Sequence, residues 1–121
     1  MSNENRRRPR VSHPFMVRYR PDTGMPKNRG WFVSPLRDLS SGGARFFSEQ
    51  AVEPGVLLQT QLLLPTAAQP VEVKARVAWA RPVRFGMTEL GVTFDPADVG
   101  SQERIDAAVE HFLREDKRER R

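Results

Sequence analysis

Two short clusters of polar residues hold the side chains in this sequence that could do chemistry. Arg6 and Arg10 are four residues apart in an arginine-rich run, and Asp38, Ser40 and Gly43 follow within Asp-Leu-Ser-Ser-Gly-Gly. A guanidinium pairs bidentately with phosphate and with the O6/N7 edge of guanine. A carboxylate accepts hydrogen bonds from the other guanine edge, and a glycine lets the backbone come close to a ligand. Together the clusters suit a ligand that carries phosphates and a guanine edge.

The net positive charge of the chain is confined to its two ends. Residues 1–10 hold four arginines and one glutamate, residues 114–121 hold five basic and three acidic residues, and residues 11–113 hold eleven of each sign. A protein that lays a broad basic face on nucleic acid would carry charge across its folded body. The distribution instead predicts a neutral domain with a basic clamp, and argues against DNA or RNA as the partner. For the C-terminal end, the simpler interpretation is solubility.

Composition narrows the classes of protein that this sequence can encode. The chain has 121 residues, 38% of them hydrophobic, which suits one domain with a small core. It has no cysteine, hence no disulfide and no thiolate metal site, and no apolar run approaches the ~20 residues that span a bilayer. The two histidines are far apart in sequence and lack the neighbouring cysteines or carboxylates of a metal site. The sequence also shows no catalytic arrangement of side chains. We therefore expect a cytoplasmic, non-enzymatic domain without a metal, a cofactor or a membrane-inserted segment.

Alternation of apolar and polar residues predicts a mainly β fold. The expected strands are His13–Arg20, Trp31–Asp38, Gly43–Ser48, Val56–Leu64, Val71–Trp79 and Met87–Asp95. The clearest alternation, in Val71–Trp79, places Trp79 on the buried face with the valines. Pro35 has no N–H donor, so its strand should lie at an edge or contain a bulge. Short strands separated by turns favour a six-stranded antiparallel barrel, because closure removes exposed edges.

The apolar period changes after the last strand and predicts a C-terminal helix. Its apolar face holds residues at i, i+3, i+4, i+7 and i+8, namely Ile105, Ala108, Val109, Phe112 and Leu113. Ser101 is the expected N-cap, and the helix should cover an open end or edge of the barrel. The chain is thus divided into a flexible basic arm (1–12), a barrel with its helix (13–113) and a charged tail (114–121).

The pattern Arg-x-x-x-Arg followed by Asp-x-Ser-x-x-Gly resembles the PilZ domain, a bacterial receptor module for cyclic di-GMP. Two further segments are similar to patterns in the fifth and sixth strands of that family: Val77-Ala78-Trp79 resembles Val-x-Trp, and Gly91-Val92-Thr93-Phe94 resembles Gly-Val-x-Phe. The resemblance covers residues 6 to about 113. It implies a six-stranded antiparallel barrel with a helix after the last strand.

The resemblance also implies a binding site for cyclic di-GMP. The implied site residues are Arg6, Arg7, Arg10, Asp38, Ser40, Gly43, Arg45 and Trp79. The arginines of the first motif would bind phosphate and stack on guanine, Asp38 would accept hydrogen bonds from guanine N1 and N2, and Gly43 would allow a positive φ or close ligand approach. Each has a simpler interpretation as a solvated arm, a turn or a core residue. We expect Arg10 and Asp38 to be exposed, so that replacing them leaves stability nearly unchanged.

Three functions remain open from the sequence. The leading one is a cyclic di-GMP receptor whose arm folds over the nucleotide and signals to a protein effector in motility, pili or exopolysaccharide output. The second is a PilZ-like adaptor that binds a protein and not the nucleotide. The third is a small barrel for single-stranded nucleic acid, which the neutral body disfavours. Asn5 and Pro9 depart from the family pattern, and leave open whether one or two nucleotides bind.

Overall fold

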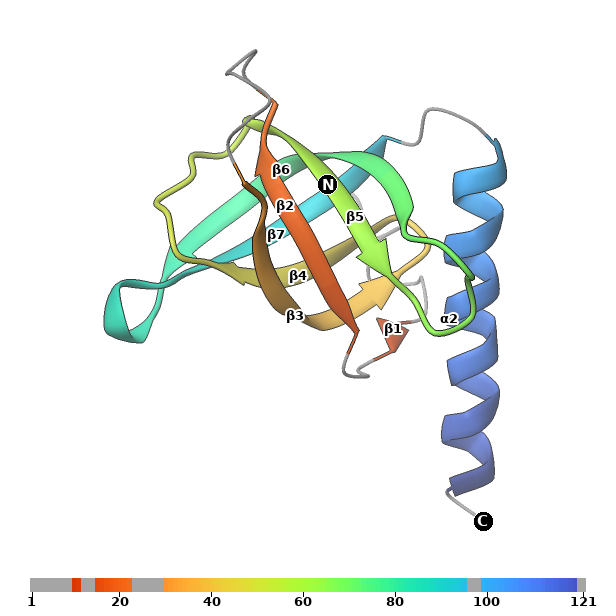
Figure 1. The fold of residues 1–121 in the computed structure, drawn as a ribbon. Helices are drawn as coiled ribbons and strands as arrows, with labels where there is room; N and C mark the ends of the chain where they lie inside the picture. The colour runs from red at the N-terminus through yellow and green to blue at the C-terminus, as the bar shows by residue number, and fades with distance from the viewer. Residues whose placement is uncertain (1–9, 12–14, 23–29, 96–98, 120–121) are drawn as a thin grey trace.

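A computed structural model of the chain describes residues 10–11, 15–22, 30–95 and 99–119. Within these residues, six strands form an antiparallel barrel, a further two-residue strand pairs at its edge, and a long helix lies beside it (Figure 1). The elements are β1 (Arg10–Val11), β2 (Met16–Pro21), β3 (Phe32–Ser40), β4 (Gly43–Ser48), β5 (Leu57–Leu63), β6 (Val71–Pro82), the 3-10 turn η1 (Arg84–Gly86), β7 (Thr88–Asp95) and α2 (Val99–Glu119). The predicted barrel with its C-terminal helix is confirmed.

Pairing of β3 on both sides closes the barrel. The strand order is β1-β3-β2-β5-β6-β7-β4, and β3 also pairs with β4. The short β1 pairs with the last two residues of β3, with Arg10 opposite Ser40 and Val11 opposite Leu39. The backbone at the end of the predicted basic arm is therefore part of the sheet. Residues 1–9 and 12 of that arm lie outside the described residues.

Alternate residues of the strands point inward and fill the barrel. The core residues that are almost wholly buried include Val17, Tyr19, Leu39, Phe46, Leu58, Leu62, Val71, Val77 and Leu90. Burial of an aliphatic or aromatic side chain of this size contributes about 1.5–3 kcal/mol. Tyr19 packs between Phe32 and Phe46, with ring centroids 5.5 Å and 5.1 Å away. The predicted inward faces of the strands are thus observed, except at the end of β6.

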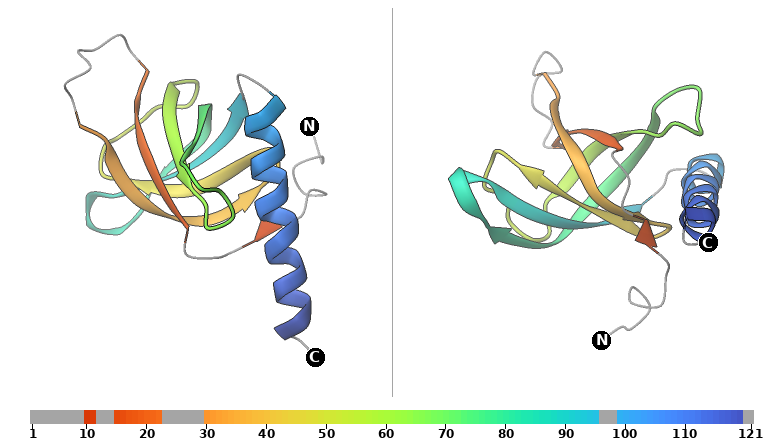
Figure 2. Two further views of the ribbon diagram at one scale, coloured as in Figure 1. Left: turned by 45° about the vertical axis from the view of Figure 1, so that its right-hand side comes forward. Right: turned by 90° about the horizontal axis from the view of Figure 1, so that it is seen from below.

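Helix α2 covers one end of the barrel and extends past it (Figure 2). It packs against β1, β3 and β6, with Ile105 and Ala108 wholly buried and Phe112 edge-on to Phe15 at 4.8 Å. The expectation that Ser101 is the N-cap is wrong, because the helix begins two residues earlier, at Val99. Ser101 instead lies in the first turn and donates a hydrogen bond to the carbonyl of Glu72 at 3.2 Å. No described helix is long and apolar enough to cross a bilayer.

A β-bulge in β3 and another in β6 change which side chains face outward. In β3, Leu36 pairs with Phe46 and Asp38 with Arg45, so Arg37 is the extra residue. Two neighbouring residues of β3 therefore oppose one residue of β4, immediately after the proline that predicted an edge or a bulge.

The bulge in β6 overturns the prediction for Trp79. Val77 pairs with Val92 and Trp79 with Gly91, so Ala78 is the extra residue and the inward–outward alternation reverses after Val77. Trp79 is consequently 38% exposed on the outside of the barrel, and not in the core. The alternation read from the sequence fails here because a bulge adds one residue to the count.

Candidate functional site

Strand register places predicted site residues in one row across four neighbouring strands. Asp38 of β3 pairs with Arg45 of β4, Arg45 pairs with Gly91 of β7, and Gly91 pairs with Trp79 of β6. Residues directly opposite each other in an antiparallel pair share a face of the sheet. We call the outer surface of these strands the arginine face, defined by Arg37, Asp38, Arg45, Trp79, Arg81 and Glu89.

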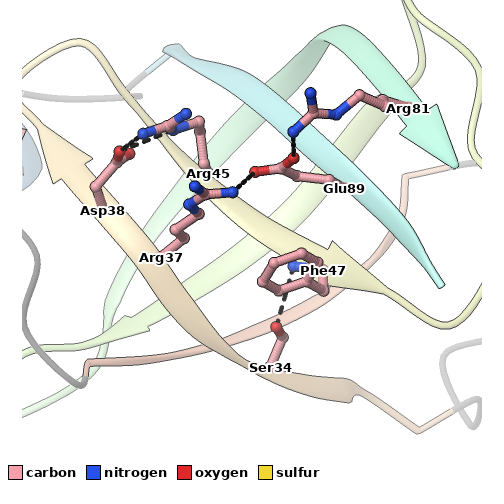
Figure 3. A network of polar contacts seen from close by, with 7 residues as sticks. All are labelled: Ser34, Arg37, Asp38, Arg45, Phe47, Arg81 and Glu89. Atoms are coloured by element: carbon pink, nitrogen blue, oxygen red, sulfur yellow. Dashed lines mark hydrogen bonds and ion pairs between the residues drawn. The ribbon is translucent and has the colours of Figure 1, made fainter. Parts of the chain in front are cut away.

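Asp38 and Arg45 form an ion pair on this face. The Nε of Arg45 donates to Oδ2 of Asp38 at 2.7 Å, and Nη2 of Arg45 contacts the same oxygen (Figure 3). The hydrogen bond to Asp38 raises the pKa of Arg45, against the opposing effect of its burial. Asp38 is only 3% exposed, which corrects the expectation of an exposed carboxylate. The guanidinium of Arg45 lies against it, so replacing Asp38 should affect folding as well as binding.

Ser40 ends β3 and Gly43 begins β4, and the two residues pair with each other across the turn between these strands. The hydroxyl of Ser40 is buried and donates to the carbonyl of Gly43 at 3.3 Å. Gly43 does not have a positive φ, contrary to one of the two expectations for it. A Cβ at this position would lie 2.1 Å from the carbonyl oxygen of Val92. Glycine is therefore required because the backbone of β7 passes so close, and close approach of a ligand remains a prediction.

Glu89 is a residue of this face that sequence reasoning missed. Its side chain is wholly buried, with Oε2 accepting from Nη1 of Arg37 at 2.8 Å and Oε1 accepting from Nη2 of Arg81 (Figure 3). Burial raises the pKa of Glu89, but the hydrogen bonds and the positive charges of Arg81 and Arg37 together outweigh it and bring the pKa below its ordinary value. No local signal marks Glu89, because its partners come from β3 and β6.

Trp79 lies over the backbone of β7. A Cβ on Gly91 would be 2.2 Å from the indole ring, so only glycine leaves room for this arrangement. The guanidinium carbon of Arg81 is 6.0 Å from the ring centroid, at the outer limit of a cation–π contact. The partly exposed indole could therefore stack with a planar ligand group.

The structure brings together the second motif but describes only the end of the first. Asp38, Ser40, Gly43, Arg45 and Trp79 lie on or beside the arginine face. The backbone of Arg10 pairs with Ser40, while Arg6 and Arg7 lie outside the described residues. Among the residues that the structure describes, no group of three or more histidine, cysteine, aspartate or glutamate side chains could hold a metal ion.

A hollow of about 460 Å³ lies on the opposite wall of the barrel, over β2, β5 and β6. Its lining residues are Arg20, Trp31, Gln59, Thr60, Gln61, Glu72, Val73 and Lys74. None of them belongs to either sequence motif. The Nε of Arg20 donates to the side-chain carbonyl of Gln59 at 2.8 Å, and its guanidinium lies 4.1 Å from the centroid of the Trp31 ring.

Solved structures share this fold at low sequence identity. MrkH of K. pneumonia in its apo state aligns with a TM-score of 0.74 and 19% identity, over 98% of this chain and 55% of that one. The Bacillus subtilis inhibitor of motility (MotI/DgrA) aligns with a TM-score of 0.71 and 16% identity, over 95% of this chain and 53% of that one. The PilZ domain with c-di-GMP of YcgR from Escherichia coli aligns with a TM-score of 0.67 and 17% identity, over 96% of this chain and 97% of that one. This chain thus spans about half the length of the first two structures.

A family model agrees with these structural similarities. No protein with a curated description matches the chain. The model described as PilZ domain matches residues 4–111, which include both sequence motifs, the barrel and most of α2. The chain therefore belongs to the PilZ domain family.

Proposed function

We propose that this protein is a receptor for cyclic di-GMP that binds the nucleotide against the arginine face. The observation that supports it is the row from Asp38 through Arg45 to Trp79, with the backbone of Arg10 paired at the adjoining edge. This brings the last arginine of the first motif to the strand that carries the second. The YcgR PilZ domain, which has the same fold, was solved with c-di-GMP.

Each residue type of the row matches a part of this ligand. Asp38 would accept hydrogen bonds from N1–H and N2–H of a guanine, while Arg45 holds the carboxylate in place. Arg45 and Trp79 present planar groups on which a base can stack, and such stacking is worth about 1–3 kcal/mol per base. Arg6, Arg7 and Arg10 would bind the phosphates as bidentate donors.

The proposed output is a change in the N-terminal arm. Binding of the phosphates by Arg6 and Arg7 would bring residues 1–9 over the nucleotide and alter the surface offered to a protein effector. Motility, pili and exopolysaccharide secretion are the candidate outputs. The nucleotide is the proposed ligand, and the effector is a protein still to be identified.

Isothermal titration calorimetry with cyclic di-GMP tests this function. We expect saturable binding that Arg10→Ala or Asp38→Ala abolishes, whereas Arg20→Ala, on the opposite wall, leaves it unchanged. Cyclic di-AMP keeps the phosphate ring but lacks the guanine edge, so it should not bind. Absence of heat, and of any shift in melting temperature, at high micromolar cyclic di-GMP would exclude the proposal.

One observation favours the second candidate, an adaptor that binds protein without the nucleotide. Asp38 is already buried and bonded to Arg45 without any ligand, as expected if the pair only stabilises the barrel. An effector that is pulled down equally with and without cyclic di-GMP, and equally by wild type and Arg10→Ala, would support the adaptor.

A further inference from the structure

A buried carboxylate ties together the two outer strands of the arginine face. Glu89 of β7 bonds Arg37 of β3 through one carboxylate oxygen and Arg81 of β6 through the other. The Glu89 side chain has no exposed surface, whereas 49% of the Arg37 side chain and 61% of the Arg81 side chain are exposed. The carboxylate thus lies between two guanidiniums (Figure 3), and both arginine side chains are partly exposed.

Both arginines reach Glu89 because of the β-bulges. Arg37 is itself the extra residue of the bulge in β3, next to Asp38. Arg81 pairs directly with Glu89, and it faces outward because the bulge at Ala78 has reversed the alternation of β6. The backbone irregularities of two strands therefore converge on one carboxylate of the strand between them.

A guanidinium that is held before the ligand arrives binds more tightly than a free one. An arginine side chain has about 2 kcal/mol of rotamer entropy to lose on being ordered. The contact with Glu89 removes part of that loss in advance, which is the usual benefit of preorganisation. Each guanidinium has five N–H donors, so those not used by Glu89 remain for an anionic group. The carboxylate also reduces the repulsion between the two cations.

We propose that Glu89 is a positioning residue of the nucleotide site, which fixes the guanidiniums of Arg37 and Arg81 for contact with a phosphate-bearing ligand. This inference rests on the proposed function. It adds to the site a residue that would act on the ligand only through the two arginines. Arg37 lies next to Asp38 in β3, and Arg81 lies two residues after Trp79 in β6. The two guanidiniums thus border the row that holds the base.

The Glu89→Gln variant tests the role with little change of shape. Glutamine keeps one carbonyl acceptor but places an NH₂ group against the other guanidinium, so one arginine is released. We expect the affinity for cyclic di-GMP to fall about tenfold, or about 1.4 kcal/mol. Glu72→Gln is the matched control, because it makes the same chemical change at an exposed position of β6, and its affinity should equal that of wild type.

Lysine substitutions separate positioning from structural support. Arg37→Lys and Arg81→Lys keep the charge but lose the planar fork, so each should weaken binding several-fold in the wild-type background. In the Glu89→Gln background, at least one of them should have little further effect, because its guanidinium is no longer held. If Glu89 only stabilises the barrel, each lysine substitution should lower the affinity for cyclic di-GMP by the same factor in the wild-type and Glu89→Gln backgrounds.

The outcomes separate this inference from the proposed function. If wild type does not bind cyclic di-GMP, both fail. If wild type binds and Glu89→Gln binds equally well, or if the lysine effects multiply independently of Glu89, only the positioning role is overturned. All variants are compared below their melting temperatures, which circular dichroism establishes for each. A reduced affinity together with coupled lysine effects supports the inference.

Discussion

The two opposite walls of the barrel each carry a tryptophan near an arginine, yet their polar contacts differ in kind. On the β2–β5 wall, Arg20 stacks on Trp31 and bonds the neutral amide of Gln59. On the arginine face, by contrast, the guanidiniums bond carboxylates that are almost or wholly buried. A tryptophan near an arginine is found on both walls, so this pair of residue types does not distinguish the candidate site. What distinguishes the candidate site is that its buried carboxylates are bonded to partly exposed arginines.

The physical meaning of that difference lies in the cost of losing a partner. An ion pair in contact with water contributes about 0–1 kcal/mol, because water solvates either charge when the other is removed. Lys74 and Asp22, 3.4 Å apart, form such a pair, with side chains 55% and 21% exposed. A buried carboxylate without its cation costs about 3–5 kcal/mol. Matched substitutions on the two walls should therefore have unequal effects.

The largest expected contrast is between two glycines. Gly43→Ala would place a methyl group against the backbone of β7, and we expect a loss of about 3 kcal/mol or more in the free energy of unfolding. Gly30→Ala, beside Trp31 on the opposite wall, meets no atom within 4 Å and should change stability by less than about 0.5 kcal/mol. Urea denaturation measures both. A Gly43→Ala protein that kept wild-type stability but lost nucleotide binding would show that the ligand, not β7, requires the glycine.

The next contrast concerns arginines around Glu89. Arg37→Ala and Arg81→Ala should each cost about 1 kcal/mol, because the other arginine still compensates the carboxylate. The double variant should lose about 3–5 kcal/mol, more than the sum, since Glu89 is then buried without a cation. Adding Glu89→Leu should restore much of that loss. Chemical denaturation checks the series, with Lys74→Ala as the control on the opposite wall; strictly additive losses would contradict it.

Aspartates on the two walls give a smaller contrast. Asp38→Ala removes a buried acceptor and leaves Arg45 without its partner, so we expect a loss of about 1–2 kcal/mol. Asp22→Ala removes a partly exposed carboxylate that is bonded to Lys74 and Gln59, and it should cost less, about 0.5 kcal/mol. Thermal melting of the two variants checks this. Equal melting temperatures for Asp38→Ala and Asp22→Ala would contradict the prediction and show that Asp38 contributes little to folding.

The smallest effect expected is in the pH dependence of stability. The pKa of Glu89 is lower in the folded protein, so the folded state favours its ionised form. Its contribution is complete above the pKa of the unfolded chain, about 4.3, and is lost as pH falls through the lower folded pKa. Wild type should therefore lose melting temperature below about pH 4.3 more steeply than Glu89→Gln. Glu72→Gln should follow the wild-type curve; parallel curves for all three would contradict the prediction.

Much of the fold could be predicted because alternation is a local property of each strand. The inward positions of Val17, Leu58 and Val71 follow from a period of two that any half-buried strand shows. The helix was predicted from its 3.6-residue period, but its start at Val99 was not. Ser101 looked like a cap, and its hydroxyl is instead bonded to β6. Caps depend on where the preceding chain leaves the barrel, which sequence does not show.

The sequence by itself determined the barrel, the apolar face of the helix and the residue types of the two motifs. Tertiary structure alone decided which charges meet. Trp79 and Arg81 face outward because a bulge shifts the register of β6, and Asp38 meets Arg45 because β3 pairs with β4. Arg37 and Glu89 are 52 residues apart and meet only through the closed sheet. Register and bulges depend on pairing between distant strands, and this is why local periodicity could not anticipate the carboxylate between the arginines.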